Sequence, residues 1–325
     1  MTLTADQEGF GTGDRRIRWS ELAAVGLHTT ADGPFVEDVF WQFLLPGGVV
    51  ELPGSMIDNA TLAAMQEALP GFDSMKLVSA MGSTSERTFR LWHGEASSWQ
   101  WDDAVFGARF TRLVERLGGR PSGALDVFGR LRAAWSGVSR RYHDLEHLMD
   151  CLRELDGAAE PAVADIAELA LWYHDAVYEP RARDAEARSA ALLEEDAASL
   201  GLSREAALAA AACVRATAHL AGARPSGPAA ELVVDVDLSI LGCDPLRFLE
   251  YEYGVAEEHA AVPSTAYVLA RGHFLAGLLA SPSIFRTEPF RQRYEASARR
   301  NLAALLRSPR YRAHRWVGRV YALFA

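Results

Sequence analysis

Ionisable side chains stand inside three apolar segments of this 325-residue chain, and they constrain its fold more than any other feature. His143 and His147 lie four residues apart, just ahead of an apolar helical pattern. His174 and Asp175 close a second apolar run, and Asp237 is flanked by Val, Leu and Ile in a third. Burying such groups without partners is costly. The fold must therefore supply partners for all three segments, most simply by bringing them together.

The chain from residue 103 onward has the pattern of a helical protein. Strand signals stop there, and apolar residues recur at helical spacing in segments separated by Gly and Pro. We therefore predict an all-α domain over residues 103–325. On a helix, the four-residue spacing of His143 and His147 would put both on one face.

Residues 1–102 have a different pattern. Residues 36–45 are rich in Val, Phe and Trp, and the turn sequence Pro46-Gly47-Gly48 separates them from an apolar run at 49–52, which predicts a β-hairpin. Residues 88–92 predict another strand, and residues 61–69 a short amphipathic helix. We expect a small α+β domain here, and the length of the whole chain fits two domains.

Charge and composition narrow the choice of partners and compartment. The net charge is −10 and no basic run occurs, which excludes nucleic acid as the main partner. Cys151, Cys213 and Cys243 have no metal-type spacing, so we expect free thiols in a reducing compartment. Residues 1–16 lack the apolar core of a signal peptide, and the apolar stretch 266–280 contains an arginine and a histidine. A cytoplasmic protein with no membrane segment is expected.

The histidines and carboxylates together suit a divalent metal ion. Helical bundles build such sites from facing helices. A mixed imidazole and carboxylate set favours manganese, iron, cobalt, nickel or zinc, with magnesium an option at a second position. Each histidine taken alone is better explained as a hydrogen-bonded core or surface residue. Only their combination with the carboxylates favours a metal site.

The order of these residues resembles the HD superfamily of metal-dependent phosphohydrolases. Residues 142–150, Tyr-His-Asp-Leu-Glu-His-Leu-Met-Asp, are similar to the Tyr-His-Asn-x-x-His-Ala-x-Asp stretch of cyclic nucleotide phosphodiesterases, which are HD relatives. Residues 171–175 and 237–239 resemble their Leu-Phe-His-Asp and Ala-Asp-Leu-Ser stretches. The glutamine and aromatic clamp that selects a cyclic nucleotide in that family has no counterpart here, so cyclic nucleotide hydrolysis is not implied.

A bacterial group of predicted HD phosphohydrolases is more similar still. Residues 174–178, 235–242 and 295–302 match its His-Asp-Ala-Val-Tyr, Asp-x-Asp-Leu-x-Ile-Leu-Gly and Glu-x-x-Ala-Arg-x-Asn-Leu segments. The resemblance covers about residues 104–307 and implies an HD-domain helical bundle.

The resemblance also implies roles for individual residues. His147, His174, Asp175 and Asp237 would be the metal ligands, with Asp175 bridging to a second metal if one is present. His143 would protonate the leaving oxygen, a task suited to an imidazole with a pKa of about 6.5. A metal lowers the pKa of bound water from about 15.7 toward about 7, which gives a nucleophile. The expected activity is hydrolysis of a phosphate ester, either a nucleotide or another small phosphomonoester.

Three further residues are weaker candidates. His219 lies between the His-Asp pair and Asp237, and could bind a second metal or the substrate phosphate; a core or surface histidine explains it about as well. Arg271 and Arg299 could clamp phosphate oxygens, although exposed helix arginines explain them better.

Other functions stay open at this point. The HD site could bind metal and nucleotide without turnover, as a sensor that signals through the N-terminal module. A structural helical protein without metal and an HD-related diiron oxygenase are further alternatives. Residues 33–41 and 69–73 resemble small bacterial proteins of unassigned function. By fold-level analogy such a module often forms dimers, so a homo-oligomer is among the expectations.

Overall fold

The computed structural model describes residues 3–12, 15–31, 37–46, 48–94, 101–158, 161–219 and 225–312. Residues 33–36 of the N-terminal resemblance and 313–325 of the expected helical domain lie outside the described residues. The chain divides into two compact units. Unit 1 contains Met1–Ser98 and Asp244–Gly254, and unit 2 contains Trp99–Cys243 and Val255–Ala325.

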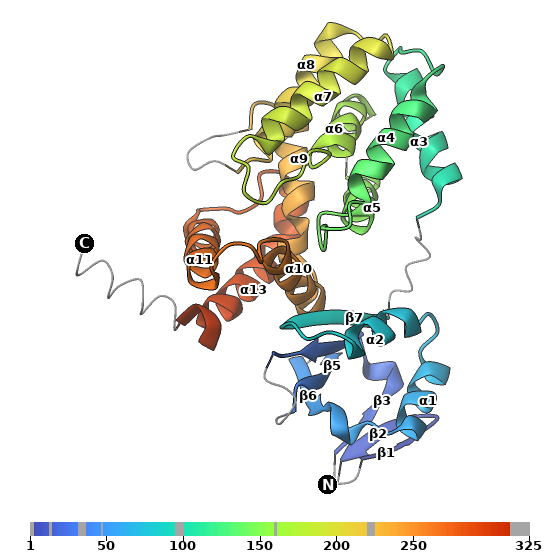
Figure 1. Cartoon of the computed structure of the whole chain (residues 1–325), viewed down its shortest axis with the longest axis vertical. Coiled ribbons are helices and arrows are strands. Elements are labelled where there is room, and N and C mark those ends of the chain that lie inside the picture. The colour runs from blue at the N-terminus through green and yellow to red at the C-terminus, as the bar shows by residue number, and fades with distance from the viewer. Residues whose placement is uncertain are drawn as a thin grey trace, which may run out of the picture. The chain divides into compact units, whose positions relative to one another are not determined.

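Unit 1 contains two antiparallel sheets (Figure 1). Its strands are β1 (Leu3–Asp6), β2 (Gly9–Thr12), β3 (Arg15–Arg18), β4 (Ala24–Thr29), β5 (Val39–Leu45), β6 (Gly48–Pro53) and β7 (Arg87–His93). The first sheet has the order β1-β2-β3 and the second β6-β5-β4-β7. The predicted hairpin is confirmed as β5 and β6, and the predicted strand at 88–92 as β7. The first sheet and β4 were not predicted.

Two capped helices complete the α+β character of unit 1. They are α1 (Asn59–Ala68), which confirms the predicted helix, and α2 (Ser74–Met81). Each begins where an aspartate accepts a hydrogen bond from a backbone amide of the first turn at 2.8 Å, Asp58 for α1 and Asp73 for α2. Met65 of α1 belongs to the same buried core as Phe10 and Phe43 of the sheets.

The segment Asp244–Gly254 belongs to unit 1 although it is far away in sequence. Leu246 is fully buried against Ala24 and Leu44, and the carboxylate of Glu250 accepts a hydrogen bond from Lys76 at 3.1 Å. The first part of α10 therefore contributes both an apolar contact and an ion pair to the N-terminal unit.

In the described residues of unit 2, every regular element is a helix (Figure 1). Its helices are α3 (Asp103–Arg116), α4 (Ala124–Trp135), α5 (Leu145–Asp156), α6 (Pro161–Tyr173), α7 (Ala185–Ser199), α8 (Arg204–Ala216), α9 (Pro228–Leu238), the end of α10 (Pro245–Glu258), α11 (Ser264–Ala280), α12 (Glu288–Phe290) and α13 (Ala296–Arg307). A π-helical turn, Arg291–Glu295, links the last two. In the described part of the chain, no helix is long and apolar enough to cross a membrane.

Helix α6 is the buried centre of unit 2. It packs against α5, α8 and α9, and it is apolar on most of its surface, as a helix surrounded by others must be. Trp172, near its end, is fully buried, and the rings of Phe106, Phe110 and Phe128 meet it edge-on at centroid distances of 5.3–6.4 Å. This packing fixes the end of α6, where the His-Asp pair follows.

Candidate metal centre

Four side chains with metal-binding groups converge in unit 2 from the ends of three helices. His147 lies in the first turn of α5, His174 and Asp175 directly follow α6, and Asp237 lies in the last turn of α9. The Nε2 atoms of the two histidines are 3.1 Å apart, and Oδ1 of Asp237 lies 3.4 Å from His147 and 3.7 Å from His174. Oδ2 of Asp175 lies 3.3 Å from Nε2 of His174 and 3.9 Å from that of His147.

These separations suit atoms that bind one ion. Two ligands at about 2.0–2.2 Å from a divalent ion lie about 3.0–3.6 Å from each other. The sequence-predicted ligands His147, His174, Asp175 and Asp237 are thus brought together within that range, or within a few tenths of an ångström of it.

The tautomer of His174 is fixed by the backbone. Its Nδ1 lies 2.8 Å from the carbonyl oxygen of Leu171, which can only accept, so Nδ1 carries the proton and Nε2 faces the cluster with its lone pair. Burial lowers the pKa of His174, although Asp175 and Asp237 act in the opposite direction. The neutral imidazole that a metal requires is therefore the favoured form.

The two carboxylate oxygens of Asp237 contact different histidines. Oδ1 faces His147 and His174, while Oδ2 lies 2.9 Å from Nε2 of His219. Burial opposes ionisation, but the hydrogen bonds with His147 and His219 outweigh it and hold the pKa of Asp237 well below its usual value. His219 has a backbone φ of 48°, a left-handed conformation that costs energy for a residue with a Cβ. His219 thus joins the predicted cluster through Asp237.

The cap of α5 positions His147. Asp144 accepts hydrogen bonds from the amides of Glu146 at 2.9 Å and His147 at 3.3 Å, so the helix begins at Leu145. His143 precedes this cap and lies outside α5, whereas His147 lies within it, so the two histidines do not share a helix face. The loop ahead of the cap instead brings the two rings together edge to face, with centroids 5.8 Å apart.

Replacing Asp144 by alanine should lower the stability of unit 2 by about 1 kcal/mol, because two amides of the first turn of α5 lose their acceptor. Urea unfolding should show a lower midpoint with an unchanged slope. The matched control is Asp58→Ala, which removes the equivalent cap of α1 in unit 1. It should lower the stability of unit 1 by a similar amount and leave metal affinity unchanged. An unchanged midpoint in Asp144→Ala would contradict the role of the cap.

Glu258, at the end of α10, is a central residue of the site that sequence reasoning missed. Its side chain is fully buried, and Oε1 accepts hydrogen bonds from the backbone amides of Arg141, Tyr142 and His143 at 2.7–3.1 Å. Oε2 lies 2.7 Å from both Nδ1 of His143 and the hydroxyl of Tyr178. Because an ionised carboxylate only accepts, Nδ1 of His143 is the donor, and Nε2 is left facing Asp175 at 4.0 Å.

The charges around His143 favour its protonated form. Burial opposes protonation, but the carboxylates of Asp175 and Glu258 outweigh it and raise the pKa of His143. The pKa of Glu258 is lowered in turn: burial opposes ionisation, and the hydrogen bond from His143 overcomes that effect. The ring of Tyr178 stacks on His143 at a centroid distance of 4.3 Å.

Arg140 is a second residue that the sequence did not reveal. Its guanidinium donates hydrogen bonds to the carbonyl oxygens of His143, Asp175 and Ala176. It also lies 5.2 Å from the ring centres of Trp135 and Tyr178. Arg140 therefore ties the loop before α5 to the turn after α6, which keeps the proton-bearing histidine beside the candidate ligands.

The two predicted arginines differ in surroundings. Arg271 lies 5.4 Å from the ring centre of Phe274, whose ring is 6.2 Å from that of His219. Arg299 donates to Glu295 and to the carbonyl oxygens of Leu279 and Ser281, at the end of α11. Arg271 is therefore connected through Phe274 with the His219 side of the cluster, whereas Arg299 joins α11 to α13.

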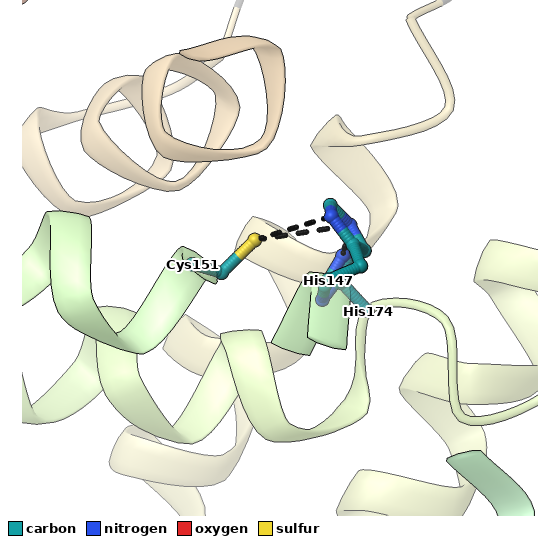
Figure 2. Close-up of side chains that lie close together, drawn as sticks. All are labelled: His147, Cys151 and His174. Atoms are coloured by element: carbon teal, nitrogen blue, oxygen red, sulfur yellow. Dashed lines mark hydrogen bonds between the residues drawn. The ribbon is translucent and has the colours of Figure 1, made fainter. Parts of the chain in front are cut away.

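Cys151 also belongs to this neighbourhood. All three cysteines of the chain are free, as predicted, and Cys151 is buried. Its thiol lies beside His147 and His174 (Figure 2). Burial, followed by the charges of Asp237 and Asp150, raises the pKa of the Cys151 thiol.

Searches of family models, curated proteins and solved structures return no match to this chain. The resemblance to HD phosphohydrolases therefore rests on the motifs alone.

Proposed function

We propose that unit 2 is a metal-dependent phosphohydrolase acting on a small phosphate ester, a nucleotide or another phosphomonoester. The observation that carries this proposal is the convergence of two imidazoles and two carboxylates: Nε2 of His147 and of His174 are 3.1 Å apart, and Asp175 and Asp237 each lie 3.3–3.9 Å from both, with His143 beside Asp175. A structural role would explain one or two such contacts, but it gives no reason for two imidazoles and two carboxylates to meet at one point.

The donor set fits a divalent cation. Two histidine nitrogens and two carboxylate oxygens suit manganese, iron, cobalt, nickel or zinc, and the carboxylates would accept magnesium at a second position. The carboxylates of Asp175, Asp237 and Glu258 put negative charge into a mostly buried region, and Arg140 and the protonated form of His143 offset only part of it. A divalent ion would compensate that excess.

The residues around the ion have complementary tasks in this proposal. A bound divalent ion supplies Lewis acidity toward a phosphoryl oxygen and toward water at neutral pH. His143 holds a proton on Nε2, on the side facing Asp175, and delivers it to the leaving oxygen. Glu258 keeps Nδ1 protonated and stabilises the imidazolium form, so the proton is available in the correct place.

The side of the cluster near His219 suits an anionic substrate. Nε2 of His219 lies 2.9 Å from Oδ2 of Asp237. The ring of Phe274 is near both the His219 ring and the guanidinium of Arg271. A guanidinium is well matched to phosphate oxygens. This arrangement supports phosphate binding on the His219 side, whereas Arg299 is not needed for it.

Removing the metal tests the proposal directly. The purified protein should contain about one or two equivalents of a divalent metal. With a panel of nucleoside monophosphates, sugar phosphates and p-nitrophenyl phosphate, it should release inorganic phosphate. A chelator should abolish this release, and manganese, iron, cobalt, nickel or zinc should restore it.

Two outcomes would contradict phosphohydrolysis. Absence of metal and of phosphate release after incubation with each ion would leave a structural helical unit. Tight metal-dependent nucleotide binding without phosphate release would instead favour the sensor function.

A further inference from the structure

Cys151 follows His147 by one helical turn on α5 and points toward the same cluster (Figure 2). The residue is 2% exposed, and its Sγ lies 3.8 Å from Nδ1 and 3.7 Å from Nε2 of His147. Ligand atoms of His147, Cys151 and His174 all lie within 4.8 Å of one another. A thiol is thus part of the cluster that the histidines form.

One distance suits a shared ion. An ion bound at about 2.05 Å from an imidazole nitrogen and about 2.3 Å from a thiolate sulfur holds these two atoms about 3.6 Å apart in tetrahedral geometry. The separation of 3.7 Å between Sγ and Nε2 of His147 is close to that value, but Nδ1 is almost as near at 3.8 Å, so Sγ lies beside the imidazole ring. To share an ion with Nε2, Sγ must move in front of that nitrogen, which rotation about the single χ1 torsion of Cys151 allows without moving the helix backbone.

The chemistry of the thiol differs from that of the other ligands. Carboxylate oxygens favour hard ions such as manganese and magnesium, whereas a thiolate favours zinc, cobalt and cadmium. His147 is close to both kinds of ligand, because its Nε2 lies 3.7 Å from the soft Sγ of Cys151 and 3.4 Å from the hard Oδ1 of Asp237.

We propose that Cys151 is a direct ligand for thiophilic divalent ions, sharing them with His147, His174 and Asp237, and that it sets the preference of the centre for zinc or cobalt over manganese. Binding forms one metal–sulfur bond and breaks the S–H bond, and the proton passes to the solvent; no oxidation is involved. The inference rests on the proposed function, because it requires that the metal centre exists.

Cobalt(II) titration of the full-length, metal-free protein under reducing conditions tests the inference. The wild type should develop visible ligand-field bands, which report any bound cobalt, and a near-ultraviolet sulfur-to-cobalt charge-transfer band, which reports the metal–sulfur bond. Cys151→Ser should keep the visible bands and lose the near-ultraviolet band. Its affinity for zinc relative to manganese should fall about 10- to 100-fold.

Cys213→Ser is the matched control, because Cys213 is another buried free thiol of unit 2 and should leave both bands unchanged. Visible bands without a charge-transfer band in the wild type would overturn the role of Cys151 and leave the metal centre intact. The absence of any cobalt bands in the wild type would overturn the metal centre itself, and the inference with it. A charge-transfer band that survives in Cys151→Ser would also overturn the inference.

Discussion

Replacing His174 by alanine is expected to remove the bound metal and the phosphohydrolase activity together. Nε2 of His174 is close to all three other candidate ligands, at 3.1 Å from His147, 3.3 Å from Asp175 and 3.7 Å from Asp237. Loss of an outer partner of a metal ligand already weakens binding by 10- to 100-fold, so loss of the ligand itself should cost at least about 100-fold in metal affinity. Elemental analysis and phosphate release measured on the same sample would check both effects.

The control for this variant is His273→Ala, because that histidine is exposed on α11. It should retain metal and activity. His174 is buried against Trp135, with ring centres 5.2 Å apart, so its removal could also disturb packing. Asp237→Asn keeps the size of the side chain and removes its charge; it should also lower metal affinity, with an unchanged circular dichroism spectrum. Full metal content in both variants would contradict the centre.

How far the sequence predicts this structure depends on how local each feature is. The hairpin of β5 and β6, the helix α1 and the buried helix α6 follow from patterns within about a dozen residues, and all were predicted. The first sheet of unit 1 has strands of four residues, and β2 includes Gly9 and Gly11, which give no strand signal. A Cβ at Gly9 would lie 2.1 Å from the carbonyl oxygen of Ile17, so close pairing of the strands requires glycine there.

The assignment of the first part of α10 to unit 1 could not be predicted either. Residues 245–258 form one continuous helix, and nothing in their spacing marks a change of unit within it. The division depends on tertiary contacts, such as Leu246 with Ala24 and Leu44.

The candidate site shows the same limit. The histidines and aspartates stand out because each is a polar residue in an apolar segment. Glu258 does not stand out, because its neighbour Glu257 is also a glutamate at the same helix end. Only the fold distinguishes them: Glu257 pairs with Arg141, and Glu258 is buried against His143, 115 residues away in the chain.

Replacing Glu258 by glutamine should reduce kcat about 10²- to 10⁴-fold and leave metal content unchanged. The side-chain oxygen of the glutamine can still accept the three hydrogen bonds from the backbone amides. The NH₂ group of the glutamine then faces Nδ1 of His143, which must become an acceptor. The proton moves to Nε2 of a neutral imidazole, and the stabilising negative charge is lost. The imidazolium that donates to the leaving oxygen is therefore less populated.

The pH profile distinguishes this role from a structural one. In the wild type, activity should fall as pH rises through the pKa of His143, because the proton donor is lost. Removing the carboxylate lowers that pKa, so the alkaline limb of kcat should shift to lower pH in Glu258→Gln. Circular dichroism and metal analysis would show that the fold and the centre remain.

Tyr178→Phe is the matched control for Glu258→Gln. It removes the other hydrogen bond to Oε2 while leaving the carboxylate and the stacked ring, so kcat should fall less than about tenfold and the alkaline limb should stay near its wild-type position. An equal loss in both variants, with no shift of the limb in Glu258→Gln, would mean that Glu258 holds the loop before α5 in place and does not tune His143.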